Sequence, residues 1–502
     1  MNQANSDTLS TCSETSVTRS RKRVPKFKKK LEHLIDTVLL LLEEGNNPIS
    51  GIKKFLKSEY DEILSPESQD PATFSEILQA KLTDIKISVD NLETFIKIAL
   101  TEKILNKTEA SRIEKELADM KTSRELETFR TLTFTPAILQ KYRSIPQRYD
   151  QYLETILREK TIEVCQTQKK VVQPLIEKFL KMMEEVDFKS MGLHKVSFSI
   201  FGSNVNNFGT SGSDIDVSLN TENYVNEREL LRLIYECYFK NLDNDDKLKV
   251  TLVAGSNVRI PLIKFDFVVE NYTVDLCVNN VLGVINSKLL QTYAEVDDRC
   301  AKLGKLVKMW AKNNGICSGQ NAVSSYGFVL MVINYLQMLD PPVLPSLQML
   351  NIDKREPREM KIKRTLEYDR KFDEAMRLDF EIDVEKIKKS FPRKNTMGLW
   401  TLLTGFFEFF AEKYPKHRGT LSVRHGHMIP RKPWTELIGE YSNRNADQFY
   451  ISIADPFDYH DPGRNLSMGN EARLRDKFQE IYKSMLNLGT DFDKFFYNKE
   501  SA

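Results

Sequence analysis

The stretch Phe201-Gly-Ser-Asn-Val-Asn-Asn-Phe-Gly-Thr-Ser-Gly-Ser-Asp-Ile-Asp-Val-Ser-Leu219 decides the fold of this 502-residue chain. It leaves an alternating run, Lys195–Phe201, that has the period of a β-strand, and it enters a second short strand, Ile215–Leu219. Asp214 and Asp216 stand two residues apart at that second strand, so their carboxylates are expected on one face of the sheet. Two anionic groups this close repel each other unless cations neutralise them.

A pair of divalent metal ions would relieve this repulsion, and carboxylate oxygens are ligands that suit Mg²⁺ or Mn²⁺. The sequence predicts a hairpin of two strands, Arg259–Val269 and Tyr272–Val278, and a third carboxylate on this hairpin would complete the metal site. Asp275 and Asp266 are the two candidates for the third ligand. Metal ions held by such acids activate an attacking hydroxyl and stabilise a leaving pyrophosphate.

Gly202 and Ser203 stand where the first strand ends. At this position they could offer backbone N–H groups and a hydroxyl to a phosphate. An isolated Asp-x-Asp pair is more often a solvated acidic turn. The combination of the pair with Gly202, Ser203 and the strand context favours a catalytic site instead.

The composition limits the class of protein. The apolar fraction of 41% and the charged fraction of 29% are typical of a folded, soluble chain. The formal net charge is only +2, so binding of nucleic acid would need local basic patches. The six cysteines have neither the spacing of a zinc site nor a disulfide-rich pattern, which favours reduced thiols inside a cell. We see no secretory h-region and no apolar run of membrane-spanning length, and we therefore expect no membrane association.

Sequence patterns divide the chain into regions. Two basic clusters, Arg19–Arg23 and Lys26–Lys30, are interpreted as a solvated tail, with a nuclear import signal or an RNA-contacting arm as alternatives. Residues 351–394 carry dense mixed charge, which predicts an exposed, mobile insertion. The predicted regions are a disordered basic tail (1–30), a helical accessory region (31–148), a mixed α/β catalytic domain (192–285) and a helical central domain (149–191 and 286–490). The central domain begins with a long helix over Tyr149–Glu185, and helix is expected to resume near Asp298 and to dominate to the end.

Gly202-Ser203, a spacer and then Asp214-Ile-Asp216 resemble the signature of the DNA polymerase β-type nucleotidyltransferase superfamily. More narrowly, residues 149–488 resemble the non-canonical poly(A) polymerases and terminal uridylyltransferases. The resemblance implies an α+β fold, in which a small mixed-sheet nucleotidyltransferase palm packs on a helical poly(A) polymerase-associated domain after an N-terminal helical extension. It also favours Asp275 over Asp266 as the third metal ligand, because the family has this ligand in a Val-Asp-apolar strand after a hairpin.

Further motifs, in the order of the family, imply contacts to the nucleotide. An Asn followed by a hydroxyl residue contacts the ribose, two lysines four residues apart on one helix grip the triphosphate, and a Ser-Tyr pair contacts phosphate and stacks on the base. Without the resemblance, the lysines would be read as a solvated stripe and the tyrosine as a core aromatic. The matching residues here are Asn286, Ser287, Lys308, Lys312, Ser325 and Tyr326.

The loop Ile453–Arg464 resembles the family's base-reading loop. In uridine-adding members, a histidine shortly before a Gly-Arg pair crowds out adenine, and nearby acids help to read the uracil edge. His460 has this position, with Asp455 and Asp458 as the acids, although the loop is one residue shorter than usual when it is counted from Asp455. The resemblance implies template-independent addition of uridines from UTP to RNA 3′ ends by two-metal-ion catalysis. A cytoplasmic poly(A) polymerase that uses ATP is the alternative.

The expected partners are single-stranded RNA 3′ ends and UTP. The sequence contains no RNA-recognition motif, KH loop or zinc knuckle, so an RNA-binding adaptor protein could direct the chain to its RNA. We expect a cytoplasmic protein, with a nuclear location as an alternative. An inactive RNA- or protein-binding scaffold of the same fold is less expected, because Asp214, Asp216 and Asp275 are all present. The 2′-5′ oligoadenylate synthases share the metal motif but lack a tyrosine helix and an Asp-Pro-Phe loop of this kind.

Overall fold

The computed structural model describes residues 148–486 and Phe496, apart from positions 211, 223–224, 245, 256–257, 318–321, 351–358, 361–375, 416–418, 432–450, 459, 464–465 and 467. The predicted basic tail, all but the last residue of the predicted accessory region and most of the predicted insertion lie outside the described residues. Those three interpretations therefore stay predictions.

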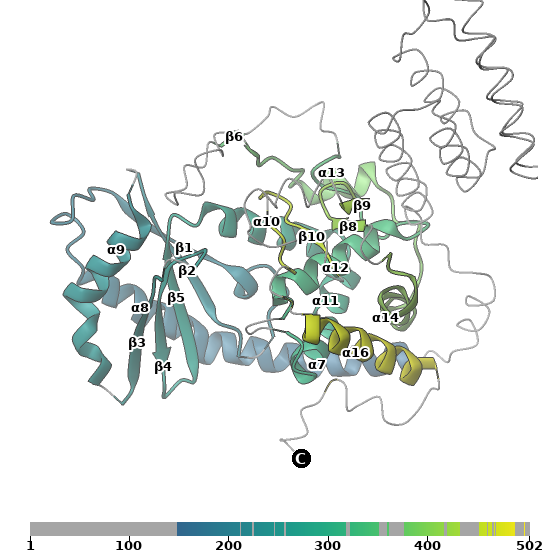
Figure 1. Ribbon diagram of the computed structural model, residues 1–502, viewed down its shortest axis with the longest axis horizontal. Coiled ribbons are helices and arrows are strands. Elements are labelled where there is room, and N and C mark those ends of the chain that lie inside the picture. Colours follow the sequence, from purple (N-terminus) through teal and green to yellow (C-terminus); the bar gives the residue numbers. More distant parts are fainter. Residues whose placement is uncertain are drawn as a thin grey trace, which may run out of the picture. The chain divides into compact units, whose positions relative to one another are not determined.

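A helical rod runs along both domains (Figure 1). It consists of α7 (Arg148–Thr167), the π-helical turn η1 (Gln168–Val172) and α8 (Gln173–Glu184), which confirms the long helix predicted from the sequence. Pro174 stands in the first turn of α8 and has no N–H to donate to the turn before it, which accounts for the local change in hydrogen bonding. The side chains of α8 pack into the core of the palm sheet. The sequence had assigned residues 149–191 wholly to the helical domain.

The palm is built on a five-stranded sheet with the order β1-β2-β5-β4-β3. Only the central pair, β2 and β5, is parallel. Alternate apolar residues of these strands are fully buried against α8 and α9, so the intervening residues, which include the acids, lie on the other face. The strands are β1 (Val196–Phe201), β2 (Ile215–Thr221), β3 (Leu248–Val253), β4 (Leu262–Phe267) and β5 (Tyr272–Val278), and the helical segments of the palm are η2 (Gly202–Asn204), α9 (Glu227–Ile234), η3 (Tyr235–Phe239) and η4 (Lys240–Asn244).

The predicted hairpin is present, with its turn at Asn271, which has a left-handed φ of 55°. Its first strand is shorter than expected, because β4 begins only after Pro261, a residue that has no N–H for a sheet ladder. Arg259 therefore lies on a loop. β3 and α9 were not predicted from the sequence.

The helical domain packs around a second, separate core that includes the fully buried Trp310. Helix dominates the described part of this domain, as expected, and a small three-stranded sheet of order β10-β8-β9, which was not predicted, lies within it. The helical segments are α10 (Val281–Val296), α11 (Asp298–Asn313), α12 (Ser325–Met338), α13 (Val384–Ser390), α14 (Leu399–Glu408), η7 (Phe409–Lys413) and α16 (Met468–Leu486), and the strands are β6 (Glu359–Met360), β7 (Met376–Arg377), β8 (Gly419–Ser422), β9 (His427–Pro430) and β10 (Ile453–Ala454).

Phe208 connects the two domains. It belongs to the loop between β1 and β2, yet its ring is fully buried in the core of the helical domain. Gly304 of α11 makes room for it, since a Cβ at this glycine would lie 2.4 Å from Phe208 Cε1. The loop that leads to Asp214 is thus anchored on α11.

Two general features bear on the composition. Within the described segments, we find no helix of sufficient length and apolarity to span a membrane. The five cysteines of these segments are free thiols.

Candidate active site

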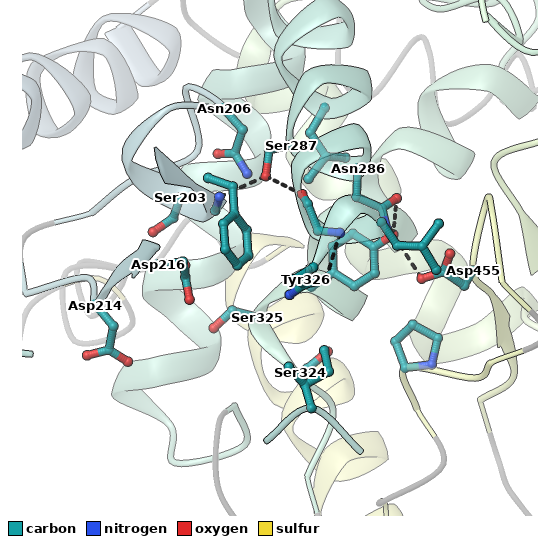
Figure 2. A pocket seen from close by; sticks show the side chains of 18 of the residues that line it. Ser203, Asn206, Asp214, Asp216, Asn286, Ser287, Ser324, Ser325, Tyr326 and Asp455 are labelled. Atoms are coloured by element: carbon teal, nitrogen blue, oxygen red, sulfur yellow. Dashed lines mark hydrogen bonds between the residues drawn. The ribbon is translucent and has the colours of Figure 1, made fainter. Parts of the chain in front are cut away.

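Asp214 and Asp216 lie at the start of β2 and line a cavity of about 760 Å³ between the palm and the helical domain (Figure 2). Asp216 stands opposite Asp275 in the parallel register of β2 and β5. Gly202 has a left-handed φ of 76°, and a Cβ on it would lie 1.9 Å from Asp216 Oδ2. Glycine is therefore needed at the end of β1 both for the backbone conformation and for the close approach of this carboxylate.

The acids lie in an environment that favours a bound cation. Burial, together with the negative charges of Asp275 and Asp214, raises the pKa of Asp216 to about 7, against the opposing effect of Lys264 and Lys308. A divalent ion would remove this penalty by compensating the anionic charge. The chemistry of the donors thus fits a hard cation such as Mg²⁺ or Mn²⁺ at Asp214 and Asp216.

The third carboxylate is arranged differently. Asp275 does not line the cavity, and its Oδ1 lies 3.0 Å from the ammonium of Lys264 on β4. Among the residues that the structure describes, no three His, Cys, Asp or Glu side chains are grouped closely enough to hold one metal ion. Asp266 accepts a hydrogen bond of 2.6 Å from Thr273 Oγ1, away from the register position of Asp216. The register of β2 and β5 favours Asp275 over Asp266 as the third ligand. The role of Asp275 as a metal ligand stays a prediction.

The cavity also collects every residue that the sequence predicted to contact the nucleotide. These residues come from the end of β1, the helices α10, α11 and α12 and the loop after β10. They are Gly202, Ser203, Asn286, Ser287, Lys308, Lys312, Ser325, Tyr326, Asp455, Asp458 and His460.

Ser287 is used inside the protein. It is buried, its hydroxyl accepts a 2.7 Å hydrogen bond from the Gly202 N–H, and it donates to the Gly283 carbonyl at 2.8 Å (Figure 2). The Gly202 N–H, which was expected to face a phosphate, is thus directed to α10. Ser203, beside it, keeps a hydroxyl at the cavity wall.

The two lysines of α11 differ in their surroundings. Lys308 is buried, and its ammonium donates a 2.7 Å hydrogen bond to the carbonyl of Phe208. Burial, together with the positive charge of the neighbouring Lys312, lowers the pKa of Lys308 to about 8. Lys312 is exposed, with its Nζ 3.4 Å from Thr210 Oγ1. Lys308 thus holds the loop between β1 and β2, and Lys312 is available to an anionic ligand.

Tyr326 stands in the first turn of α12, next to Ser325. Its hydroxyl lies 2.7 Å from Asn286 Oδ1 and 3.1 Å from Asp455 Oδ2 (Figure 2). Burial, together with the negative charge of Asp458, raises the pKa of Asp455 to about 6. These contacts fix the ring of Tyr326 at the wall of the cavity, between α10 and the loop after β10.

The loop after β10 is held by the palm as well as by its own domain. Its Asp458 forms an ion pair with Arg259, which lies on the loop before β4. Within the loop, Asp455 N–H donates to the His460 carbonyl at 3.0 Å, and His460 N–H donates to the Asp458 carbonyl at 2.8 Å. Arg259 also lines the cavity. From the sequence, Arg259 was expected on a strand. Its position two residues before a proline was the only sequence feature that could have pointed to its place at the cavity.

Comparison with known proteins agrees with this architecture. Residues 150–295 match the family described as the central palm domain of mitochondrial-like poly(A) RNA polymerases, and residues 399–461 match the family described as Cid1 family poly A polymerase. A solved structure of the Cid1 poly(U) polymerase has a TM-score of 0.55 at 22% identity and covers 70% of this chain and 99% of that chain. At this level of identity, the likeness supports the fold.

The sequence relatives include enzymes of two kinds. The chain is 32% identical over 269 residues to poly(A) RNA polymerase GLD2-B of Xenopus laevis, covering 52% of this chain and 46% of that protein. It is 28% identical over 324 residues to terminal uridylyltransferase 4 of Homo sapiens, covering 63% of this chain and 18% of that protein. It spans about half the length of the two GLD2 relatives from Xenopus laevis.

Fold and site together define the nucleotidyltransferase type of fold, with a palm and a poly(A) polymerase-associated domain. Within that class, residues 150–295 and 399–461 are similar to the corresponding domains of non-canonical poly(A) and poly(U) RNA polymerases.

Proposed function

We propose that this protein adds uridines from UTP to the 3′ ends of single-stranded RNA without a template. The observation that carries the proposal is the single cavity that unites Asp214 and Asp216 with Tyr326 and His460. It offers acids for metal ions at one end and an aromatic ring with a histidine-bearing loop at the other. Such a cavity fits a nucleoside triphosphate, with its phosphates toward the acids and its base toward the loop.

Different residues of the cavity contact the phosphates, the ribose and the base of the nucleotide. The hydroxyls of Ser203 and Ser325 and the ammonium of Lys312 bind phosphate oxygens. Asn286 hydrogen-bonds the ribose, and the ring of Tyr326 stacks on the base. Divalent ions, Mg²⁺ or Mn²⁺, held by Asp214 and Asp216 with Asp275 as the proposed third ligand, would activate the attacking RNA 3′-hydroxyl and stabilise the leaving pyrophosphate.

His460 is proposed to select UTP over ATP. Uracil has one ring and adenine has two, so a side chain at the far end of the base site excludes the larger base more than it attracts the smaller one. Solved structures of Cid1, which this chain resembles in fold, are described as revealing the mechanism for UTP selectivity. The resemblance of the loop Ile453–Arg464 to the family's base-reading loop assigns the corresponding role here to His460, with Asp455 and Asp458 beside it. An enzyme that uses ATP is the second candidate, because the GLD2 relatives are poly(A) polymerases and the loop is one residue shorter than usual.

The deciding experiment is transfer to a labelled RNA primer with each nucleoside triphosphate in turn, followed by kcat/KM for UTP and ATP in the wild type and in His460→Ala. We expect the wild type to prefer UTP, and the variant to lose about tenfold or more of that preference, mainly because it gains activity with ATP. A wild type that prefers ATP would establish the poly(A) polymerase instead. If neither the wild type nor Asp214→Ala transfers any of the nucleotides, the protein is an inactive scaffold of this fold.

The partners and the location follow from this activity as proposals. The RNA 3′ end has to reach the acids, and an adaptor protein would choose the RNA, because the sequence offers no dedicated RNA-binding module. We propose a cytoplasmic location, where UTP and RNA 3′ ends are both available, with nuclear import as the alternative. Co-purification of the full chain from cells with and without ribonuclease treatment would separate a protein adaptor from association through RNA.

A further inference from the structure

We propose that Asp461, a residue with no assigned role, positions His460 and so sets the nucleotide preference of the cavity. This inference rests on the proposed function of His460 in choosing the base. Asp461 follows His460 directly, and it stands at the point where the loop after β10 returns to the body of the domain. It is a positioning residue, because it acts on the nucleotide through its neighbour.

The carboxylate of Asp461 ties both ends of the loop together. Its Oδ1 accepts hydrogen bonds from Ile453 N–H at 3.2 Å and from Gly463 N–H at 2.7 Å, and its Oδ2 accepts one from Ser452 Oγ at 2.9 Å. Ser452 and Ile453 lead into the loop, and Gly463 leaves it. One buried side chain, 5% exposed, thus sets the distance across the stem of the loop.

The stem is itself fixed to the three-stranded sheet. Ser452 N–H donates to Tyr414 Oη at 3.1 Å, and Thr420 Oγ1 of β8 donates to Ser452 Oγ at 2.9 Å. Every one of these groups is buried, so each hydrogen bond is made in a low dielectric and its loss is costly. Asp461 therefore connects the loop to a rigid part of the helical domain.

Further hydrogen bonds hold the backbone of the rest of the loop after β10. The Pro456 carbonyl accepts hydrogen bonds from Gln348 Nε2 at 2.9 Å and from Arg424 Nη1 at 3.0 Å. The backbone of His460 is bonded on both sides, to Asp455 and to Asp458. In a loop that is one residue short, the place of the imidazole depends on where its last turn is held, and Asp461 holds that turn.

The test compares kcat/KM for UTP and ATP, with the same primer, in the wild type and in Asp461→Ala. The ratio should move toward equality by about fivefold to tenfold, because a displaced imidazole no longer limits the size of the base. Asp461→Asn keeps Oδ1 as an acceptor for both N–H groups, so it should restore most of the ratio. If Asp461→Ala does not fold, Asp461→Ser is measured instead. The serine hydroxyl can accept one hydrogen bond where the aspartate accepts three.

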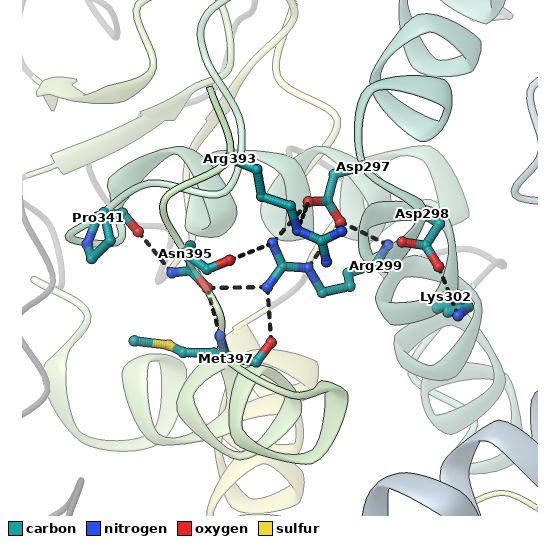
Figure 3. Close-up of polar contacts among 8 residues, drawn as sticks. All are labelled: Asp297, Asp298, Arg299, Lys302, Pro341, Arg393, Asn395 and Met397. Atoms are coloured by element: carbon teal, nitrogen blue, oxygen red, sulfur yellow. Dashed lines mark hydrogen bonds and ion pairs between the residues drawn. The ribbon is translucent and has the colours of Figure 1, made fainter. Parts of the chain in front are cut away.

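Asp297 provides the matched control. It is also 5% exposed, and it also accepts a backbone N–H and side-chain donors, but its partners Arg299 and Arg393 lie around the start of α11 (Figure 3). Asp297→Ala should lower the melting temperature and leave the ratio of UTP to ATP unchanged. The ratio is informative whichever nucleotide the wild type prefers, so failure of the uridylyltransferase proposal does not obscure the result.

A double-mutant cycle with His460→Ala shows whether Asp461 acts through its neighbour. If it does, Asp461→Ala changes the ratio in the wild type and has no further effect in His460→Ala. An unchanged ratio in a folded, active Asp461→Ala protein would overturn the proposal. So would equal effects of Asp461→Ala in both backgrounds.

Discussion

At the scale of single residues, the acids of the sheet are held in a state that the fold itself disfavours. Asp216 is desolvated and faces two further carboxylates, so its pKa rises from 3.8 to about 7. A carboxyl group whose pKa is higher in the folded protein than in the unfolded chain binds protons more tightly when folded. Its contribution to stability is therefore complete below about pH 4 and is lost as the pH rises through 7.

Asp216→Asn should accordingly raise the melting temperature of metal-free protein at pH 8 by several degrees, and should change it little at pH 4. Thermal unfolding in EDTA at the two pH values measures this difference, and comparison with the wild type cancels the pH dependence of the other acids. Added Mg²⁺ or Mn²⁺ should stabilise the wild type and not the variant, which should also have no transferase activity. A variant less stable than the wild type at pH 8 would contradict the assignment of Asp216 as a strained metal ligand.

At the scale of elements, the two lysines of α11 have equivalent positions in the sequence pattern, but in the structure Lys308 is buried and Lys312 is exposed. Lys312→Met should leave the melting temperature unchanged and raise the KM for nucleotide by about tenfold, because it removes an exposed cation from the phosphate end of the cavity. Lys308→Met keeps the apolar stem but leaves the Phe208 carbonyl without its ammonium donor. It should cost about 1–3 kcal/mol of stability and lower kcat as well.

Unfolding in urea and steady-state kinetics on both α11 variants separate these roles. Equal KM effects without any loss of stability would show that Lys308 binds phosphate in the same way as Lys312. Loss of stability in Lys312→Met would show that it, too, is part of the structural anchor.

Elements with strong local signals could be predicted from the sequence, and elements defined by distant partners could not. The alternating run of β1 and the span of β5 agree with the prediction, because the pattern of buried and exposed residues is local. β8 and β9 are only four residues long; all of β8 is buried and only Met428 of β9 is, so neither strand has an alternating pattern. The spacing of Lys308 and Lys312 gave the shared helix, but the Phe208 carbonyl that Lys308 binds is 100 residues away and leaves no trace in the local pattern.

At the scale of the whole described molecule, the palm and the helical domain are joined by Phe208. Phe208→Ala would leave a cavity in the core against Gly304, at a cost of about 3–5 kcal/mol. It should also lower kcat, because the loop that carries Asp214 loses its anchor. Phe208→Leu fills most of the space and should recover most of both properties. A fully active Phe208→Ala protein of reduced stability would show that the loop is positioned by β1 and β2 alone.

The helical rod of α7 and α8 determines which fragments of this chain can be expected to fold. Its first half supplies Leu153 and Ile156 to one core, and its second half supplies Ile176 and Phe179 to the other. A fragment that starts at the first strand would lose a wall of each domain, although it would keep every residue of the cavity. The smallest piece expected to fold alone therefore begins no later than the rod, and the two domains have to be expressed together as one module.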